Sequence, residues 1–185
     1  MSQIRKVAVV VGSLRKGAYS RMTARALMSV APESLELEIV EIGDLEMYNQ
    51  DLDGIPPDSW TVFRDKLVGF DAFLFVTPEY NRSVTGAMKN AVDVGSRPPG
   101  KGVWGGKPGA IVSTSPGAMG GVSAHLNLRQ TLIALNVEIM PQPEMYIGGV
   151  NKLFDEDGNL IVDATRDFFT KFMASFATWI ERLSE

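Results

Sequence analysis

The sequence predicts a doubly wound α/β fold built around a parallel sheet of about five strands. Short, continuous apolar runs recur along the chain, and each is separated from the next by a segment with helical potential. Such runs are typical of parallel strands that helices cover on both faces. The end of the chain adds an amphipathic helix whose apolar side must pack on a sheet.

The first apolar run, residues 6–11, is rich in β-branched residues and ends at Gly12. It is too short for a helix interior and too uniformly apolar for a strand with one wet face, so we expect a central parallel strand. Runs of the same kind predict further strands at residues 35–42, 72–77, 110–114 and, shorter, 136–140, where Pro141 ends the run. The intervening segments predict crossover helices at residues 21–30, 60–69, 83–94 and 123–135.

The C-terminal helix has the clearest pattern of all the predicted elements. Its apolar residues fall at spacings of three and four and form one wide stripe: Phe168, Phe172, Phe176, Trp179, Ile180 and Leu183. A stripe with this period is typical of a helix that packs on a core. We therefore expect these aromatic side chains to belong to the core and not to a cofactor site.

The composition is that of an ordinary soluble globule, with 45% hydrophobic and 22% charged residues in 185, and predicts a single domain over residues 1–185. The net charge of −4 predicts no general attraction to nucleic acid or to an anionic membrane. The lack of cysteine excludes disulfides and thiol chemistry, and a single histidine makes a protein-built metal site unexpected. With no signal-peptide layout and no run of ~20 apolar residues, we expect a cytoplasmic protein that does not span a membrane.

Three unusual segments directly follow predicted strands: residues 12–21, 78–81 and 115–121. In an open α/β sheet, ligands bind outside the carboxyl ends of the strands, at the point where the strand order reverses. Loops that are distant in sequence meet at that edge. We therefore expect the three segments to form one ligand site.

The first loop brings hydroxyls and cationic side chains together just before a helix: Ser13, Arg15, Lys16, Ser20 and Arg21. Hydroxyls, cations and the free N–H groups of a helix start are the donors that bind phosphate. A polar turn with Ser20 as a simple N-cap is the structural alternative. The loop lacks the pattern of a Walker loop, and Leu14 breaks the dinucleotide fingerprint, so a mononucleotide fits better.

The second loop, Pro78-Glu79-Tyr80-Asn81, places a carboxylate, an aromatic ring and an amide in one short turn. Such a turn suits a planar heterocycle that takes hydrogen bonds along one edge. The third loop begins Ser115-Pro116-Gly117 and continues with glycines that let the backbone approach a ligand closely. The alternative for the second loop is a purely structural turn, and the alternative for the third is a plain flexible loop.

These motifs, together with residues 86–93 (Gly-Ala-Met-Lys-Asn-Ala-Val-Asp), resemble the NADPH-dependent FMN reductase family, in particular its branch of quinone and chromate reductases. The resemblance extends over about residues 4–183. It implies a flavodoxin-like three-layer sandwich whose five parallel strands have the order 2-1-3-4-5.

The resemblance also implies roles for the loop residues. By position, Ser13, Arg15, Ser20 and Arg21 would bind the FMN phosphate. Pro78, Glu79, Tyr80 and Asn81 would line the isoalloxazine ring, and Ser115, Pro116 and Gly117 would contact the other side of the flavin. The chain reads Ala-Tyr-Ser at residues 18–20, where members of this branch often carry Ser-Phe-Asn.

The implied activity is FMN-dependent reduction of quinones or similar small acceptors, such as free flavin, azo compounds or chromate, by ping-pong hydride transfer from NADPH or NADH. Because FMN carries the chemistry, no catalytic side chain is assigned. The family also implies a homodimer or homotetramer. A flavodoxin-like electron carrier without direct NAD(P)H turnover is the alternative, which Arg15, Arg21 and the modest net charge disfavour.

Other residues carry smaller predictions. Lys89 and Asp93 lie four apart on a helix, at the spacing of an ion pair, and His125 is expected on a helix surface or a subunit interface. Residues 155–158 predict a surface hairpin. A proline-rich loop offers three side chains for the mouth of the flavin site: Arg97, Lys101 and Trp104.

Overall fold

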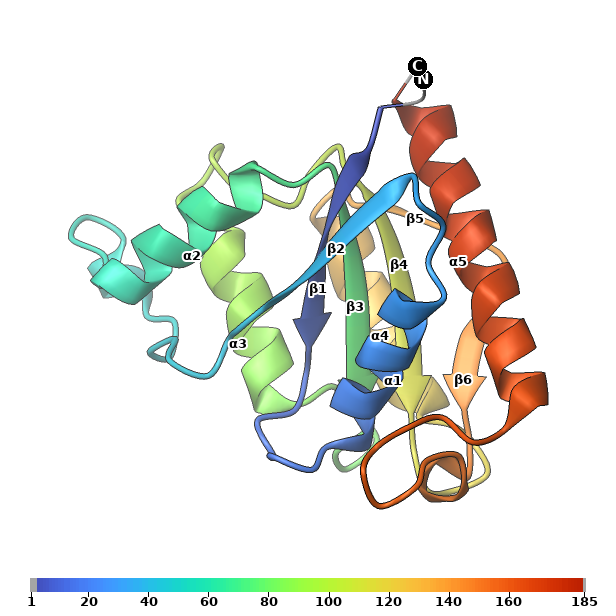
Figure 1. Ribbon diagram of the computed structural model, residues 1–185. Helices are drawn as coiled ribbons and strands as arrows, with labels where there is room; N and C mark the ends of the chain where they lie inside the picture. The colour runs from blue at the N-terminus through green and yellow to red at the C-terminus, as the bar shows by residue number, and fades with distance from the viewer. Residues whose placement is uncertain (1–2, 185) are drawn as a thin grey trace.

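The computed structural model describes residues 3–184 and has a six-stranded sheet at its centre (Figure 1). The strands are β1 (Arg5–Val11), β2 (Leu35–Val40), β3 (Ala72–Pro78), β4 (Pro108–Thr114), β5 (Glu138–Ile139) and β6 (Met145–Ile147). Their pairings are all parallel and give the order β2-β1-β3-β4-β5, with β6 also beside β4. The expected order is confirmed, and the switch point lies between β1 and β3.

The fifth position of the sheet is divided between two short strands, where the sequence predicted one strand at residues 136–140. β5 pairs with the first residues of β4, and β6 pairs with the last three, Val112–Thr114. Pro141 and Pro143 lie between them and have no backbone N–H to donate to a ladder. The prolines therefore interrupt the strand, and β6 was missed because its three residues make too short an apolar run.

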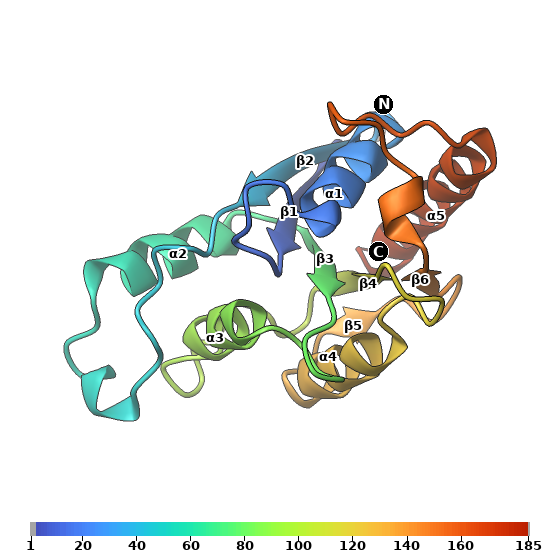
Figure 2. The ribbon, with the colours of Figure 1, turned by 90° about the horizontal axis from the view of Figure 1, so that it is seen from below.

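Five helices cover the two faces of the sheet (Figures 1 and 2). One face carries α1 (Tyr19–Ser29) and α5 (Asp163–Leu183), and the other carries α2 (Asp58–Val68), α3 (Gly86–Gly95) and α4 (Val122–Ala134). Two 3-10 turns, η1 (Gln50–Leu52) and η2 (Val150–Lys152), complete the elements. Alternate residues of 7–11 in β1 enter the two cores, so this part of the strand is apolar throughout.

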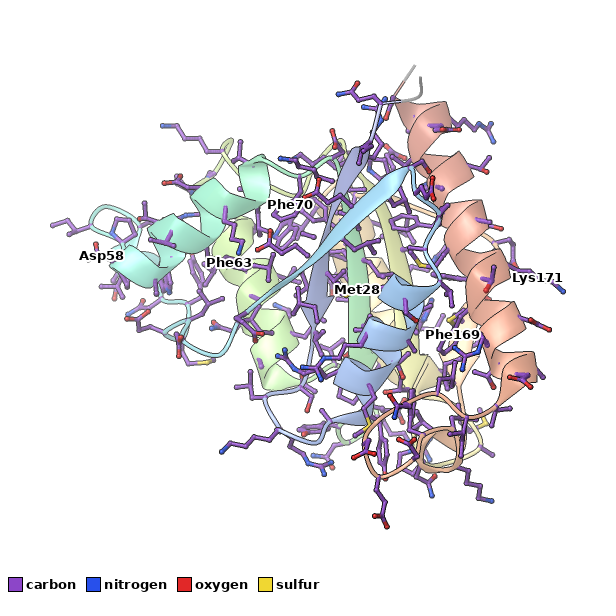
Figure 3. The ribbon with its side chains drawn as sticks, viewed as in Figure 1. Met28, Asp58, Phe63, Phe70, Phe169 and Lys171 are labelled. Carbon is purple, nitrogen blue, oxygen red and sulfur yellow. The ribbon has the colours of Figure 1, made fainter. Side chains whose placement is uncertain are left out.

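The buried stripe of α5 keeps Phe172, Phe176 and Ile180 of the predicted one, but its other residues differ. Its buried side chains are Phe169, Phe172, Met173, Phe176, Ala177 and Ile180. Phe168 and Leu183, expected in the core, are 37% and 41% exposed. Figure 3 shows Phe169 on the side of α5 that faces the sheet and Lys171 on the outer side. Apolar residues at spacings of three and four continue the stripe equally well from Phe168 or from Phe169. Contact with the sheet buries the side of the helix that contains Phe169 and Met173.

Trp104 belongs to the core and not to the mouth of the flavin site. It is 1% exposed, its indole N–H donates to the carbonyl of Val92 at 2.9 Å, and its ring lies edge-on to Phe73 at 4.8 Å. Gly95 makes room for it, because a Cβ there would lie 2.5 Å from the indole. The sequence prediction for this tryptophan was wrong because a proline-rich loop gave no sign of folding back onto the sheet.

Arg97 and Lys101 also lie away from the strands' carboxyl edge. Both follow the C-terminal end of α3, a helix that begins at that edge and runs away from it (Figure 1). The guanidinium of Arg97 is 5.6 Å from the centre of the Tyr48 ring. Their predicted place at the mouth is therefore corrected.

Two smaller predictions are confirmed. The Nζ atom of Lys89 lies 2.7 Å from the Asp93 carboxylate. An antiparallel bridge between Phe154 and Leu160 closes the hairpin around residues 155–158. Within residues 3–184, no helix has the length and apolar character needed to cross a bilayer.

Candidate flavin site

The loops after β1, β3 and β4 meet at the carboxyl edge of the sheet, seen end-on in Figure 2. They enclose a cavity beside the N-terminus of α1. Eight of the predicted residues line it: Ser13, Arg15, Ser20, Pro78, Glu79, Tyr80, Ser115 and Pro116. Four further lining residues had no distinctive sequence signal: Ala18, Tyr19, Thr114 and Val150. Three predicted residues, Arg21, Asn81 and Gly117, are not part of the lining.

Ser13 and Ser20 form the end of the cavity next to α1, and both are buried, with exposures of 4% and 1%. The hydroxyl of Ser20 has no hydrogen-bond partner among the described residues. The structural alternative, in which Ser20 caps α1, is wrong: the helix begins at Tyr19, and its N-cap is Ala18, whose side chain cannot cap. An unpaired buried hydroxyl at an uncapped helix start has the donors that a phosphate needs.

The two arginines of the first loop lie in different places. Arg15 lines the cavity, and within residues 3–184 no carboxylate pairs with it. Arg21 donates two hydrogen bonds to Glu41, at 2.7 and 2.6 Å, which raise the pKa of the arginine and lower that of the glutamate. The guanidinium of Arg21 is therefore paired with Glu41, and Arg21 does not line the cavity.

The second loop contains a tight two-residue turn. Tyr80 and Ser83 exchange backbone N–H···O bonds at 3.0 Å in both directions. The two central residues, Asn81 and Arg82, have φ values of 50° and 65°, as in a type I′ turn. The turn presents Tyr80, which is 49% exposed, between the cavity and a second hollow lined by Leu14, Thr85 and Ala87.

The third loop is joined to β6 and to itself by hydrogen bonds. The Ser115 N–H donates to the carbonyl of Ile147 in β6, and the Ser115 hydroxyl accepts from Gly117 N–H. Gly120 and Gly121 have φ values of 60° and 78°, where glycine is favoured. A Cβ on Gly120 would lie 2.6 Å from the backbone of Tyr146, so the loop rests directly on β6.

His125 is buried beside Tyr146 of β6, which corrects its expected place on a surface or interface. It is 2% exposed, its Nδ1 atom has no partner among the described residues, and its ring lies 4.6 Å from that of Tyr146. Burial lowers its pKa from 6.5 to about 4; the nearby carboxylate of Glu144 opposes the shift, and Arg129 adds to it. The sequence shows a histidine on a helix but not which side of the helix is covered.

The buried imidazole predicts a loss of stability in mild acid. The unfolded chain binds a proton at His125 near pH 6.5, whereas the folded chain binds it only near pH 4. Stability is therefore full above pH 6.5 and falls as the pH decreases toward 4, by a total on the order of 3 kcal/mol. Urea unfolding from about pH 7.5 to about 4.5 should show this decline, and His125→Leu should flatten it. An equally steep decline in the variant would contradict this assignment.

The comparisons with known proteins agree with this geometry. The model of the NADPH-dependent FMN reductase family matches residues 5–152. A quinone reductase of Pseudomonas putida is 55% identical over 182 residues, which span 98% of this chain and 97% of that protein. A 2-hydroxy-1,4-benzoquinone reductase of a Burkholderia species is 45% identical, with 95% and 96% covered. The solved structure of FerB, a flavoenzyme NAD(P)H:(acceptor) oxidoreductase of Paracoccus denitrificans, superposes with a TM-score of 0.90 at 38% identity, covering 97% and 98%.

Fold and site together define a flavodoxin-like oxidoreductase with a mononucleotide site at the carboxyl edge of its sheet. The chain belongs to the NADPH-dependent FMN reductase family. It is an FMN-dependent enzyme that uses NAD(P)H as its co-substrate.

Proposed function

We propose that this enzyme reduces quinones and similar small acceptors at an FMN held in the cavity between the three loops. The observation that carries the cofactor's placement is the unpaired Ser20 hydroxyl, which is buried at the uncapped start of α1 and lines the cavity. A phosphate bound there would pair the hydroxyl and complement the positive end of the helix. The choice of quinones is supported by the names of the relatives with 55% and 45% identity.

The lining residues divide between the two ends of the cofactor. Ser13, Arg15 and Ser20 would hold the phosphate, and Arg21 is left out because Glu41 holds its guanidinium. The ring would lie between the turn at residues 78–81 and the loop at residues 115–117. FMN, when bound, takes a hydride from a reduced nicotinamide and passes electrons to the acceptor, so the protein's task is orientation.

Tyr80 is the residue that would face both the ring and its reaction partners. It lines the cavity and also the second hollow, and half of its surface is exposed. NAD(P)H and the acceptor would occupy the same open side of the flavin in turn. This order predicts ping-pong kinetics, and free flavin, azo compounds and chromate are further acceptors that could use the same opening.

We also propose that the chain acts as a single domain, in the cytoplasm, as a homodimer or homotetramer. The segment between β2 and α2 projects from the body of the molecule (Figure 1) and exposes the apolar side chains Met47, Leu52 and Ile55, at 73%, 37% and 88%. Apolar side chains gathered on a projecting segment are typical of a subunit contact. The net charge of −4 gives nucleic acid no general attraction.

An anaerobic absorbance titration tests the proposed function. FMN-loaded protein should lose its visible flavin absorbance on addition of NADH or NADPH and regain it on addition of benzoquinone. Binding of FMN without bleaching by either nicotinamide would indicate an electron carrier and overturn the proposal. Bleaching that benzoquinone does not reverse would overturn the assignment of quinones as acceptors.

A further inference from the structure

We propose that Glu79 is a positioning residue for the flavin: its carboxylate fastens the Tyr80 turn to the first turn of α4 and thereby fixes one wall of the ring site. The proposal rests on the proposed function, because it concerns the same cavity. It assigns Glu79 an indirect role, since the carboxylate itself is already bound to protein groups.

The carboxylate has partners on both sides. Its Oε2 atom accepts from the backbone N–H of Ala124 at 3.1 Å, and its Oε1 atom lies 3.8 Å from a guanidinium nitrogen of Arg82. The Glu79 side chain is only 13% exposed. One carboxylate therefore bridges the turn to α4.

The start of α4 needs a partner from outside the helix. Its N-cap is Gly121, which has no side chain, and no side chain of the N-cap position binds the first turn. A carboxylate at this position satisfies a free N–H and complements the positive end of the helix. Glu79 thus supplies from the β3 loop the cap that α4 lacks in its own sequence.

A second contact fastens the other end of the turn to the same helix. The hydroxyl of Ser83 donates to Oδ1 of Asn127, one helical turn beyond Ala124. Asn81 and Arg82, between the two contacts, have left-handed backbone conformations that non-glycine residues rarely adopt. Contacts at both ends hold this strained turn in place.

The consequence is that two of the flavin loops behave as one rigid unit. The loop at residues 115–121 leads directly into α4, and Glu79 joins the Tyr80 turn to that helix. Loss of the carboxylate would let the turn move relative to residues 115–117, which would disturb the ring and leave the phosphate end unchanged. Ring-binding properties are therefore the sensitive readout.

The test compares Glu79→Ala with Glu79→Gln, which keeps an acceptor oxygen, and with Asp71→Ala. Asp71 is a matched control, because its carboxylate accepts from the Lys6 N–H at the opposite edge of the sheet. Affinities for FMN and for riboflavin, which lacks the phosphate, are measured together with the visible circular dichroism of the bound flavin.

Glu79→Ala should weaken the binding of FMN and of riboflavin by the same factor, roughly 10-fold, and should alter the circular dichroism of the bound flavin. Glu79→Gln should keep most of the wild-type affinity and most of the wild-type spectrum. Asp71→Ala should change neither. If Glu79→Ala lowers thermal stability but leaves both affinities and the spectrum as in the wild type, Glu79 is only a helix cap and the positioning role is overturned. Failure of the wild type itself to bind FMN would instead overturn the proposed function.

Discussion

Replacing Ser20 by alanine is expected to weaken FMN binding by about 10- to 100-fold. A hydrogen bond to a charged group is worth about 1.5–3 kcal/mol, which corresponds to that loss of affinity. Calorimetric titration of the variant and of the wild type with FMN measures this loss.

Thr23 is the matched control for this experiment. It lies on the same helix, is fully buried, and has a hydroxyl with no partner within residues 3–184, but it does not line the cavity. Thr23→Val replaces the hydroxyl by a methyl group of similar size, so it should stabilise the protein and leave FMN affinity unchanged. Equal losses of FMN affinity in the two variants would show that the effect of Ser20 is not local to the cavity.

Replacing Gly120 by alanine is expected to lower the free energy of unfolding by about 3 kcal/mol or more. The left-handed backbone of Gly120 costs a residue with a Cβ about 1 kcal/mol. The added Cβ would also lie 2.6 Å from the carbonyl carbon of Tyr146, a backbone atom that cannot turn aside. Since Gly120 lies in the loop that would contact the flavin, FMN affinity should fall as well. Urea unfolding gives the first effect, and calorimetric titration gives the second.

A Gly149→Ala variant distinguishes the cost of the left-handed backbone from the cost of the close contact with Tyr146. Its φ of 59° matches that of Gly120, but a Cβ there would meet no atom within 4 Å. Gly149→Ala should therefore show the cost of the backbone conformation alone, about 1 kcal/mol. If the two alanine variants lose the same stability, the close approach of the loop to β6 is not the cause.

The strands and the position of the site were predictable from the sequence for one physical reason. Strands buried on both faces are apolar at every residue, and parallel strands deliver their following loops to one edge of the sheet. Residues 7–11 and 72–76 show this directly. Eight predicted residues therefore line one cavity, although their roles toward FMN remain predictions.

Other features depended on contacts that a sequence pattern does not contain. The phase of α5 was set by the sheet, which selected Phe169 over Phe168. Burial of Trp104 depended on its loop folding back onto α3 and the sheet, and burial of His125 depended on the packing of α4 beside Tyr146. The engagement of Arg21 by Glu41 joins residues on α1 and after β2, and nothing in the phosphate-loop motif indicates it.

A crystal structure of the protein with FMN would show where the cofactor binds. We expect a phosphate within hydrogen-bonding distance of the Ser20 and Ser13 hydroxyls, and an isoalloxazine ring between Tyr80 and residues 115–117. A phosphate bound away from the start of α1, or a ring that does not contact Tyr80, would contradict this placement.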